Sequence, residues 1–247
     1  MRYFLELAYQ GGAYHGWQRQ PNAITVQEVL ERALSTLLRI NITVVGAGRT
    51  DAGVHAKQLF VHFETPTIEA TDHLVHRLNA FLPQDIAVTQ IAPVHANVHA
   101  RFDAVSRTYE YLVVTTKNPF YKDSAHLVPL PLDIPQMTTA ASLLMDYQDF
   151  KCFSKAHSDV KTYLCDITHA EWTNTGDLLR FTITADRFLR NMVRAIVGTL
   201  LEIGLGKRSV AEMKSIIESR DRSRAGVSVP AKGLYLTRVT YPDNIYL

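Results

Sequence analysis

The order of strand-like and helix-like segments limits the fold of this sequence more than any other feature. Short apolar runs bounded by turn residues predict strands, and apolar residues at helical spacing predict helices. In the first half, the pattern predicts the order βαββαβ. The six segments are residues 3–9, 25–40, 42–45, 59–63, 72–82 and 86–91.

The helix expected at residues 25–40 has the clearest local signature. Thr25 followed by Glu28 is a capping-box pattern, in which each side chain can satisfy a backbone amide of the first turn. Apolar side chains then recur along one face of the helix. Pro83 ends the second helix, because proline cannot continue a helical hydrogen-bond ladder.

The second half repeats much of this order. A strand and a helix are followed by a hairpin, two helices and a last strand, and Ser209 with Glu212 forms a second capping box. The segments are residues 108–114, 134–147, 164–172, 178–184, 188–203, 210–219 and 234–241.

Together, these patterns predict an α+β fold with two domains. Two ferredoxin-like or RRM-like βαββαβ halves would join into a mostly antiparallel sheet with helices on one face. Residues 1–104 would form the N-terminal subdomain and residues 105–247 the C-terminal one. An open sheet face of this kind suits a large ligand better than a small molecule in a pit, although a fold does not dictate function.

Composition narrows the class of protein only slightly. The 247 residues are 47% hydrophobic, enough for a well-buried core, and no run of eighteen apolar residues predicts a membrane span. Cys152 and Cys165 stand alone, which argues against a disulfide framework or a cysteine zinc site and favours a reducing, cytoplasmic compartment. Residues 1–104 carry 8 Lys and Arg against 9 Asp and Glu, and the rest carry 18 against 15. Net charge therefore says little about nucleic-acid binding.

The glycine-rich stretch GAGRTDAGVHA, residues 46–56, resembles two nucleotide-binding templates and fits neither. A P-loop needs Lys and then Ser or Thr where Val54 and His55 stand. In a dinucleotide fingerprint, Asp51 would occupy the third glycine position and repel the pyrophosphate. Two interpretations remain: a tight turn in which the aspartate caps its own backbone, or a loop that presents Arg49 and Asp51 for chemistry.

Asp51 has no second carboxylate nearby in sequence, and no known acid-base motif accompanies it. A single carboxylate indicates a covalent nucleophile, or an electrostatic partner of a carbocation-like centre, rather than hydrolysis by an acid-base pair. Asp51 is therefore the candidate catalytic residue.

The helix expected from residue 188 predicts a cationic face. At about 100° per residue, the side chains that share a sector of about 100° are Arg187, Arg190, Asn191 and Arg194. Such a stripe can be a solvated face, but the other positions are apolar almost all round, which favours burial. A buried Arg194 would need a carboxylate partner, and it could orient Asp51.

Two further stretches could contact a nucleic acid. Tyr109 and Tyr111 share one strand face, either as core residues or as a platform on which a base stacks. Residues 219–239 form a loop that could bind phosphate, close over a substrate or simply be solvated. It supplies the cations Arg220, Arg222, Arg224 and Lys232.

Four motifs, in this order and spacing, resemble the TruA family of tRNA pseudouridine synthases. They are GRTDAGVHA, SRTYEYLVV, FLRNMVRAIVG and RDRSRAGVSVPAKGLYL, and the likeness extends over essentially the whole chain. The resemblance implies the pseudouridine synthase fold and isomerisation of uridine at positions 38 to 40 of the tRNA anticodon stem-loop. It further implies a homodimer that binds tRNA, with no cofactor and no metal.

Carried over motif by motif, the resemblance assigns roles to several residues. Asp51 would be the catalytic aspartate, Tyr109 the active-site tyrosine against the target base, and Arg194 the ion-pair partner of Asp51. Arg49 resembles the arginine associated with the flipped nucleotide. The other expected substrate-binding residues are Arg187, Arg190, Arg222 and Lys232.

The sequence departs from the family pattern at two places. Cys165 stands where family members commonly carry arginine, and Ser228-Val229 stands where Thr-Ala is usual. These departures put particular RNA contacts in doubt, but not the reaction. His95 and His99 have metal-like spacing, yet no carboxylate lies between them, so we expect connector histidines.

Two functions from other classes remain as alternatives. The first is a catalytically silent RNA-binding protein, which would need neither Asp51 nor Arg194. The second is a phosphoryl-transfer enzyme that uses the glycine loop, which predicts saturable binding of a nucleoside triphosphate. For an isomerase, the sequence leaves open whether the carboxylate attacks covalently or assists an elimination at the sugar.

Overall fold

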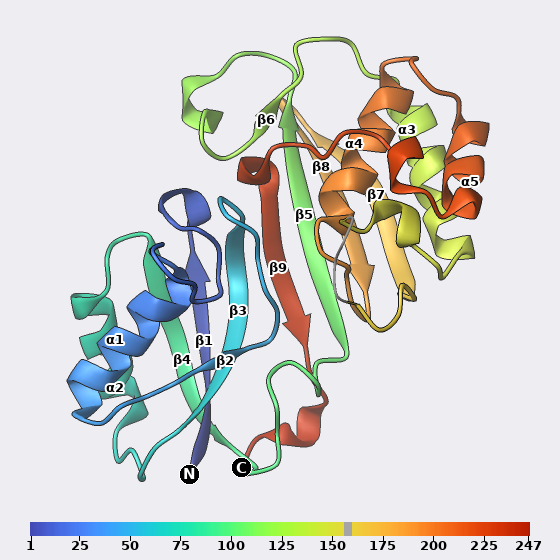
Figure 1. Ribbon diagram of the computed structural model, residues 1–247. Coiled ribbons are helices and arrows are strands. Elements are labelled where there is room, and N and C mark those ends of the chain that lie inside the picture. The colour runs from blue at the N-terminus through green and yellow to red at the C-terminus, as the bar shows by residue number, and fades with distance from the viewer. Residues whose placement is uncertain (156–159) are drawn as a thin grey trace. The chain divides into compact units, whose positions relative to one another are not determined.

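The computed structural model describes residues 1–155 and 160–247 (Figure 1). The chain divides into two compact units. Unit 1 comprises Met1–Val105 and Tyr235–Leu247, and unit 2 comprises Ser106–Leu234. The C-terminal segment, which sequence analysis assigns to the second half, therefore belongs to unit 1. Among the described residues, no helix has the length and apolar character needed to cross a membrane.

Unit 1 has the predicted order of elements. They are β1 (Arg2–Tyr9), α1 (Val26–Leu38), β2 (Val45–Gly46), β3 (His55–Glu64), α2 (Thr71–Phe81), β4 (Ile86–Val94) and, from the C-terminus, β9 (Leu234–Thr240). The strand order is β4-β1-β3-β9, and β2 also pairs with β3. Neighbours are antiparallel except β9, which runs parallel to β3.

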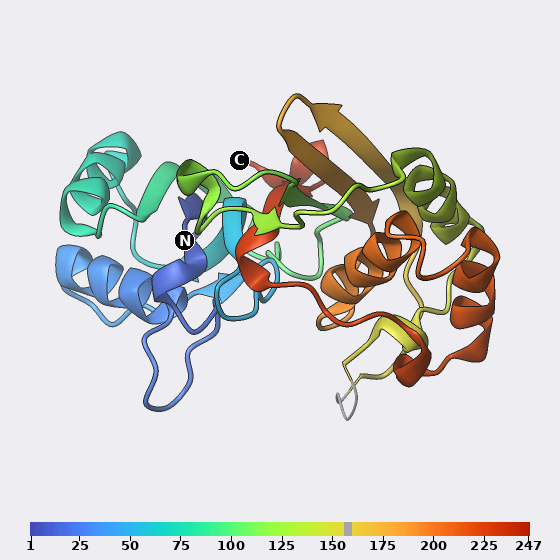
Figure 2. The same cartoon turned by 90° about the horizontal axis from the view of Figure 1, so that it is seen from above.

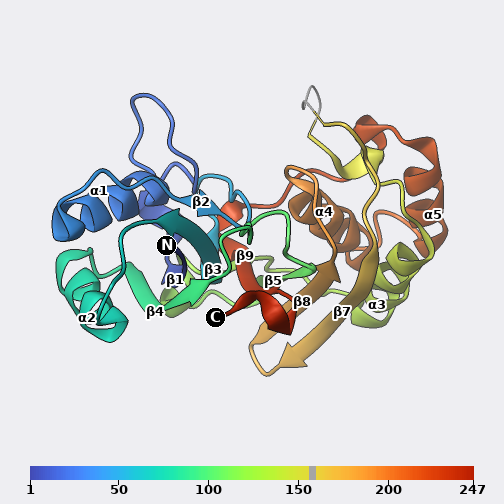
Figure 3. The ribbon, with the colours of Figure 1, turned by 90° about the horizontal axis from the view of Figure 1, so that it is seen from below.

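Alternation along β1 and the amphipathic pattern of α1 build the core of unit 1. Leu5 and Leu7 of β1 and Leu30 and Leu34 of α1 are fully buried. Each such side chain contributes about 1.5–3 kcal/mol relative to exposure. Thr25 caps α1 as predicted, because its side chain accepts a hydrogen bond from the Glu28 amide. Helices α1 and α2 lie together on one side of the strands (Figure 3).

The strand predicted at residues 42–45 is wrong for most of its length, since β2 covers only Val45–Gly46. Side chains of α1 bind the backbone there instead. The Ile42 amide donates to Ser35 Oγ (2.9 Å), and the Val44 amide donates to Glu31 Oε1 (3.0 Å). Because these amides are already satisfied, the segment needs no strand partner.

Unit 2 contains β5 (Ser106–Val114), β6 (His126–Leu127), α3 (Ile134–Ser142), β7 (Ile167–Thr175), β8 (Leu178–Ala185), α4 (Met192–Gly204) and α5 (Val210–Ser219). The strands β5-β8-β7 are antiparallel neighbours, and β6 pairs in parallel with β5. The three helices lie together beside the β7-β8 hairpin (Figure 2). The predicted α+β class, with mostly antiparallel strands, is confirmed.

Two helix boundaries in unit 2 differ from prediction. The predicted helix 134–147 ends as α3 at Ser142 and continues as a 3₁₀ turn, Leu143–Asp146. The helix predicted from residue 188 begins at Met192, because Asn191 adopts a left-handed conformation with φ of 67°. An L-residue in that conformation interrupts a right-handed helix.

Candidate active site

The candidate catalytic loop joins β2 to β3 in unit 1. Asp51 is half-buried and Arg49 is exposed. The Val54 amide donates to the Asp51 carbonyl oxygen (3.1 Å), and Gly53 takes a positive φ of 78°. The glycine permits this tight turn because it has no Cβ. The loop thus returns directly into β3.

Residues 9–17 hold the backbone on both sides of Asp51. Tyr9 Oη and Thr50 Oγ1 form a buried hydrogen bond of 2.8 Å. The Trp17 amide donates to the Thr50 carbonyl oxygen (3.1 Å), and the Gly53 amide donates to the Tyr14 carbonyl oxygen (3.4 Å). These bonds fix the residue before Asp51 and the residue two after it. No pattern in the sequence assigned residues 9–17 to the site.

Glycines make this close approach of two chain segments feasible. A Cβ atom on Gly11 would lie 1.9 Å from the Val54 carbonyl oxygen. On Gly16, whose φ is 89°, it would lie 2.5 Å from the Thr50 carbonyl oxygen. Both distances are far below van der Waals contact, so neither position accepts a side chain without movement of the backbone. The glycines of residues 10–17 are the sequence signal that could have revealed this contact.

His55 adds a further anchor after the loop. Its side chain is buried, and its Nδ1 accepts a hydrogen bond from the Gly11 amide (3.0 Å). A nitrogen that accepts cannot carry a proton, so a neutral ring holds its hydrogen on Nε2. The imidazole stacks on Tyr235 with ring centroids 4.6 Å apart, and Lys57 Nζ lies 5.4 Å from the same tyrosine ring.

The two tyrosines of β5 have different surroundings. Tyr109 is half-buried, and its ring meets Phe188 edge to face at 5.2 Å. Tyr111 is fully buried, and its hydroxyl donates to the Pro230 carbonyl oxygen (2.8 Å). Burial raises the pKa of Tyr111 above its usual value. Tyr111 is therefore a core residue, which is one of the two interpretations that the sequence left open, and only Tyr109 remains a candidate for stacking on a base.

Arg194 lies in the first turn of α4 and is half-buried. Its Nε donates to the Val229 carbonyl oxygen (2.7 Å), and the Val229 amide donates back to the Arg194 carbonyl oxygen (3.2 Å). This reciprocal pair fixes the start of the side chain against residues 228–230. Asp51 belongs to unit 1 and Arg194 to unit 2. Their ion pair stays a prediction.

The predicted cationic helix face is wrong, because Arg187 and Arg190 precede α4 rather than lie on it. The Arg187 amide donates to Asp186 Oδ1 (2.7 Å), and the exposed Arg190 accepts a hydrogen bond at its carbonyl oxygen from the Lys155 amide (3.0 Å). Of the four residues expected to share the face, only Arg194 belongs to the helix.

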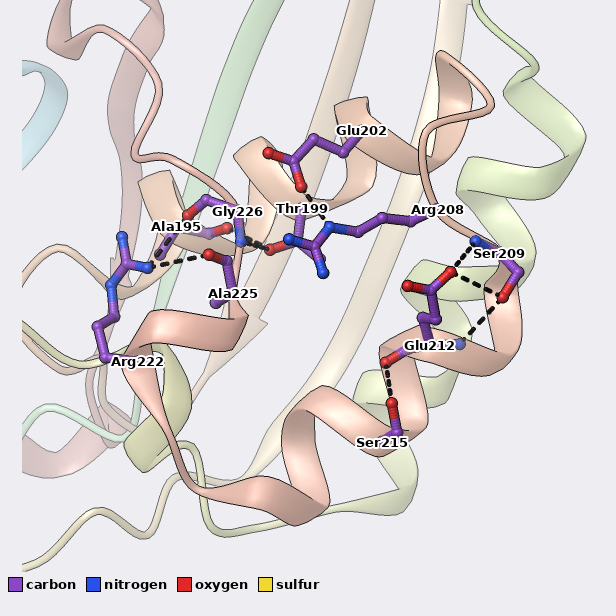
Figure 4. Close-up of polar contacts among 10 residues, drawn as sticks. All are labelled: Ala195, Thr199, Glu202, Arg208, Ser209, Glu212, Ser215, Arg222, Ala225 and Gly226. Carbon is purple, nitrogen blue, oxygen red and sulfur yellow. Dashed lines mark hydrogen bonds and ion pairs between the residues drawn. The ribbon is translucent and has the colours of Figure 1, made fainter.

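The Arg222 guanidinium donates hydrogen bonds to groups of its own loop (Figure 4). Its Nη1 donates to the carbonyl oxygens of Ala225 (3.4 Å) and Gly226 (3.1 Å), and its Nη2 donates to Ser228 Oγ (3.0 Å). Asn191 Nδ2 donates to the same hydroxyl (2.5 Å). Ser228, one of the family departures, is thus a shared acceptor that ties this loop to the start of α4.

Arg220, Arg224 and Lys232 also bind protein groups. Lys232 Nζ donates to the Lys122 carbonyl oxygen (2.5 Å), and Arg220 Nε lies 2.9 Å from Asp149 Oδ2. Arg224 Nη2 donates to Ser215 Oγ (3.3 Å). The structure therefore gives this basic loop a folding role that the sequence alone does not reveal.

Packing of α4 against the same loop depends on Thr199. Its hydroxyl donates to the Ala195 carbonyl oxygen (2.9 Å) and accepts from the Gly226 amide (2.8 Å), as Figure 4 shows. A Cβ on Gly198 would lie 1.9 Å from the Val227 carbonyl oxygen, so the helix and the loop are in backbone contact. This contact holds the segment that Arg194 binds.

Cys165 and the connector histidines also have local roles. Burial raises the pKa of the Cys165 thiol to about 12. The His95 amide donates to the Ile245 carbonyl oxygen (3.2 Å), and the Arg101 amide donates to His99 Nδ1 (3.1 Å). Within the described residues, no group of three or more His, Cys, Asp or Glu side chains could hold a metal ion.

Comparisons with known proteins identify the class. The family model described as tRNA pseudouridine synthase matches residues 7–103 and 140–242. A Parabacteroides distasonis protein is 52% identical over 246 residues, which are 99% of this chain and 98% of its own length. A Porphyromonas gingivalis protein is 53% identical over 253 residues, covering 100% and 99%. A Bacillus subtilis protein is 42% identical over 248 residues, covering 99% and 100%.

All three relatives are named tRNA pseudouridine synthase A. The α+β units and these full-length matches define an enzyme of the isomerase class. The chain belongs to the tRNA pseudouridine synthase family, and the predicted TruA resemblance is confirmed.

Proposed function

We propose that this isomerase converts uridine to pseudouridine in the tRNA anticodon stem-loop, at positions 38, 39 and 40, with Asp51 as its catalytic carboxylate. The observation that carries the proposal is the buttressed loop, in which Thr50 and Gly53 are held on either side of Asp51. A rigid backbone keeps a reacting group in one geometry, and this lowers the cost of reaching the transition state.

The reaction needs one carboxylate beside the ribose. The bond from N1 to C1′ breaks, the uracil turns, and a bond from C5 to C1′ forms while C5 loses its proton and N1 gains one. The Asp51 carboxylate either attacks the sugar or base covalently or assists an elimination at the sugar. In both routes the Asp51 carboxylate is the group that acts on the substrate.

The remaining site residues act around this step. The target nucleotide must leave its stack, which costs a few kcal/mol. We propose that the exposed Arg49 fills the space it leaves and that Tyr109, supported by Phe188, contacts the extruded base. Arg194 would orient the Asp51 carboxylate.

Four other cations would serve tRNA binding in two ways. Arg187 and Arg190, on the connection before α4, would contact phosphate directly. Arg222 and Lys232 would act by holding residues 222–232 in shape, which fits their hydrogen bonds to backbone oxygens. The resemblance further supports a cytoplasmic homodimer that needs neither metal nor cofactor.

The test is tritium release from tRNA labelled at uridine C5, in the presence of EDTA. We expect release by the native protein and none by Asp51→Ala, which should still bind tRNA. Asp123→Ala, at an exposed position of unit 2, is the matched control and should be active. Replacing uridines 38, 39 and 40 by cytidine should abolish release.

A native protein that binds tRNA but releases no tritium from any tRNA would support the RNA-binding alternative. Full activity of Asp51→Ala would overturn the catalytic assignment and leave the family unchanged.

A further inference from the structure

A loop at residues 18–24 protrudes from unit 1 just before α1, and it is seen in blue in Figures 2 and 3. Its sequence, QRQPNAI, contains one cation and no acidic residue. We propose that this loop binds the tRNA backbone next to the target nucleotide and that Arg19 contacts a phosphate. The inference rests on the proposed function of Asp51, because it concerns the same substrate.

Hydrogen bonds at its base and along its length give the loop a defined conformation. The His15 amide donates to the Ile24 carbonyl oxygen (2.9 Å), and Gln20 Nε2 donates to the His15 carbonyl oxygen (2.7 Å). The Arg19 amide donates to Gln27 Oε1 (3.0 Å). A preformed loop pays little ordering entropy when a ligand binds, so such a surface suits recognition.

The base of the loop is joined to the Asp51 loop. Trp17, the residue before the loop, donates from its amide to the Thr50 carbonyl oxygen (3.1 Å). Two residues of chain span at most about 7 Å, so the Arg19 backbone stays within that distance of Trp17. A polymer whose nucleotide reaches Asp51 must therefore pass close to residues 18–24.

The exposed side chains of the loop favour a phosphate backbone as the ligand. The Arg19 side chain is 64% exposed, and its Nη1 lies 3.7 Å from Glu31 Oε2. Glu31 Oε1 also accepts from Gln27 Nε2 and from the Val44 amide, both at 3.0 Å. The glutamate thus lies beside one edge of the Arg19 guanidinium. The guanidinium has five donors in a planar fork, a geometry suited to bidentate binding of phosphate. Ile24, 62% exposed, offers an apolar contact for a sugar or base.

The experiment measures the Kd of native protein and Arg19→Ala for unmodified tRNA at 50 and 200 mM KCl. Each phosphate contact adds about 0.9 to the slope of log K against log salt. Loss of one contact therefore predicts weaker binding by Arg19→Ala at 50 mM, with the Kd ratio of variant to native falling about 3.5-fold by 200 mM. Turnover at saturating tRNA should stay within about threefold of native, since the arginine binds rather than reacts.

Two matched variants complete the test. Arg19→Lys keeps the charge and should retain the native salt slope, whereas Arg77→Ala removes an exposed arginine from α2 and should change nothing. Arg19→Gln replaces Arg19→Ala if the alanine variant unfolds. Equal Kd values and equal salt slopes for native protein and Arg19→Ala would overturn the inference. A salt slope of Arg19→Lys as small as the one expected for Arg19→Ala would overturn it too. Absence of tritium release by the native protein would instead count against the proposed function, because binding is read separately.

Discussion

Replacement of Thr199 by valine tests how the loop that binds Arg194 is held against α4. Valine has the shape of threonine but lacks the hydroxyl, so the buried Gly226 amide loses its acceptor. An unsatisfied buried amide costs about 1–3 kcal/mol. The equilibrium constant for folding of unit 2 should therefore decrease about 5- to 150-fold. The melting temperature should decrease by about 2–4 °C for each kcal/mol of lost stability.

Urea unfolding followed by circular dichroism measures the loss, and hydrogen exchange locates it. We expect faster exchange of the Gly226 amide in Thr199→Val. Thr199→Ser is the control, because it keeps the hydroxyl and loses only a methyl group, so its Gly226 amide should stay protected. If Thr199→Val were as stable as the native protein with unchanged exchange, the hydroxyl bridge would not hold the loop.

Two further predictions concern unit 1. Tyr9→Phe removes the hydroxyl that binds Thr50 beside Asp51. Because the loop is then held less firmly, we expect kcat to fall about 10- to 100-fold with little change in the Kd for tRNA. The control Tyr3→Phe, on the same strand, should keep the native kcat. Burial, reinforced by the nearby charges of His99 and Arg2, lowers the pKa of His62 to about 4 from 6.5. Between these pKa values the unfolded state therefore binds more protons than the folded state, so the urea midpoint of unfolding should decrease as the pH is lowered from 7 to 4. An equal decrease of the urea midpoint in a His62→Asn variant would refute this reasoning.

Local sequence signals predict an element well where its start carries a chemical signature. The capping box of Ser209 and Glu212 is present in the structure, and α5 has the predicted bounds, Val210–Ser219. The start of α4 could not be predicted in the same way, because periodicity continues through residues 188–191 while Asn191 turns left-handed. That conformation accompanies a tertiary hydrogen bond from Asn191 to Ser228, which lies 37 residues further along the chain.

In the candidate site, too, local features could be predicted from the sequence and tertiary contacts could not. Asp51 and Arg49 could be selected as candidates from the sequence, because they stand in a glycine-rich loop that fits no nucleotide-binding template. The support from Tyr9 and Trp17 was missed, since the glycines of residues 10–17 signal a close backbone approach but do not mark Thr50 as the partner. The membership of β9 in unit 1 has the same cause, because strand pairing over this separation depends on the whole fold.

Position in the fold, rather than residue type, separates the arginines of this chain by role. Arg222 donates to two carbonyl oxygens and a hydroxyl of its own loop, so the fold already uses both of its terminal nitrogens. Arg49 lies on the Asp51 loop and Arg19 on the loop of residues 18–24, which is joined to it, and both are exposed. Since a cation engaged with buried carbonyls must give up those bonds to reach a phosphate, the exposed pair should contribute more to the salt dependence of tRNA binding than Arg222 does.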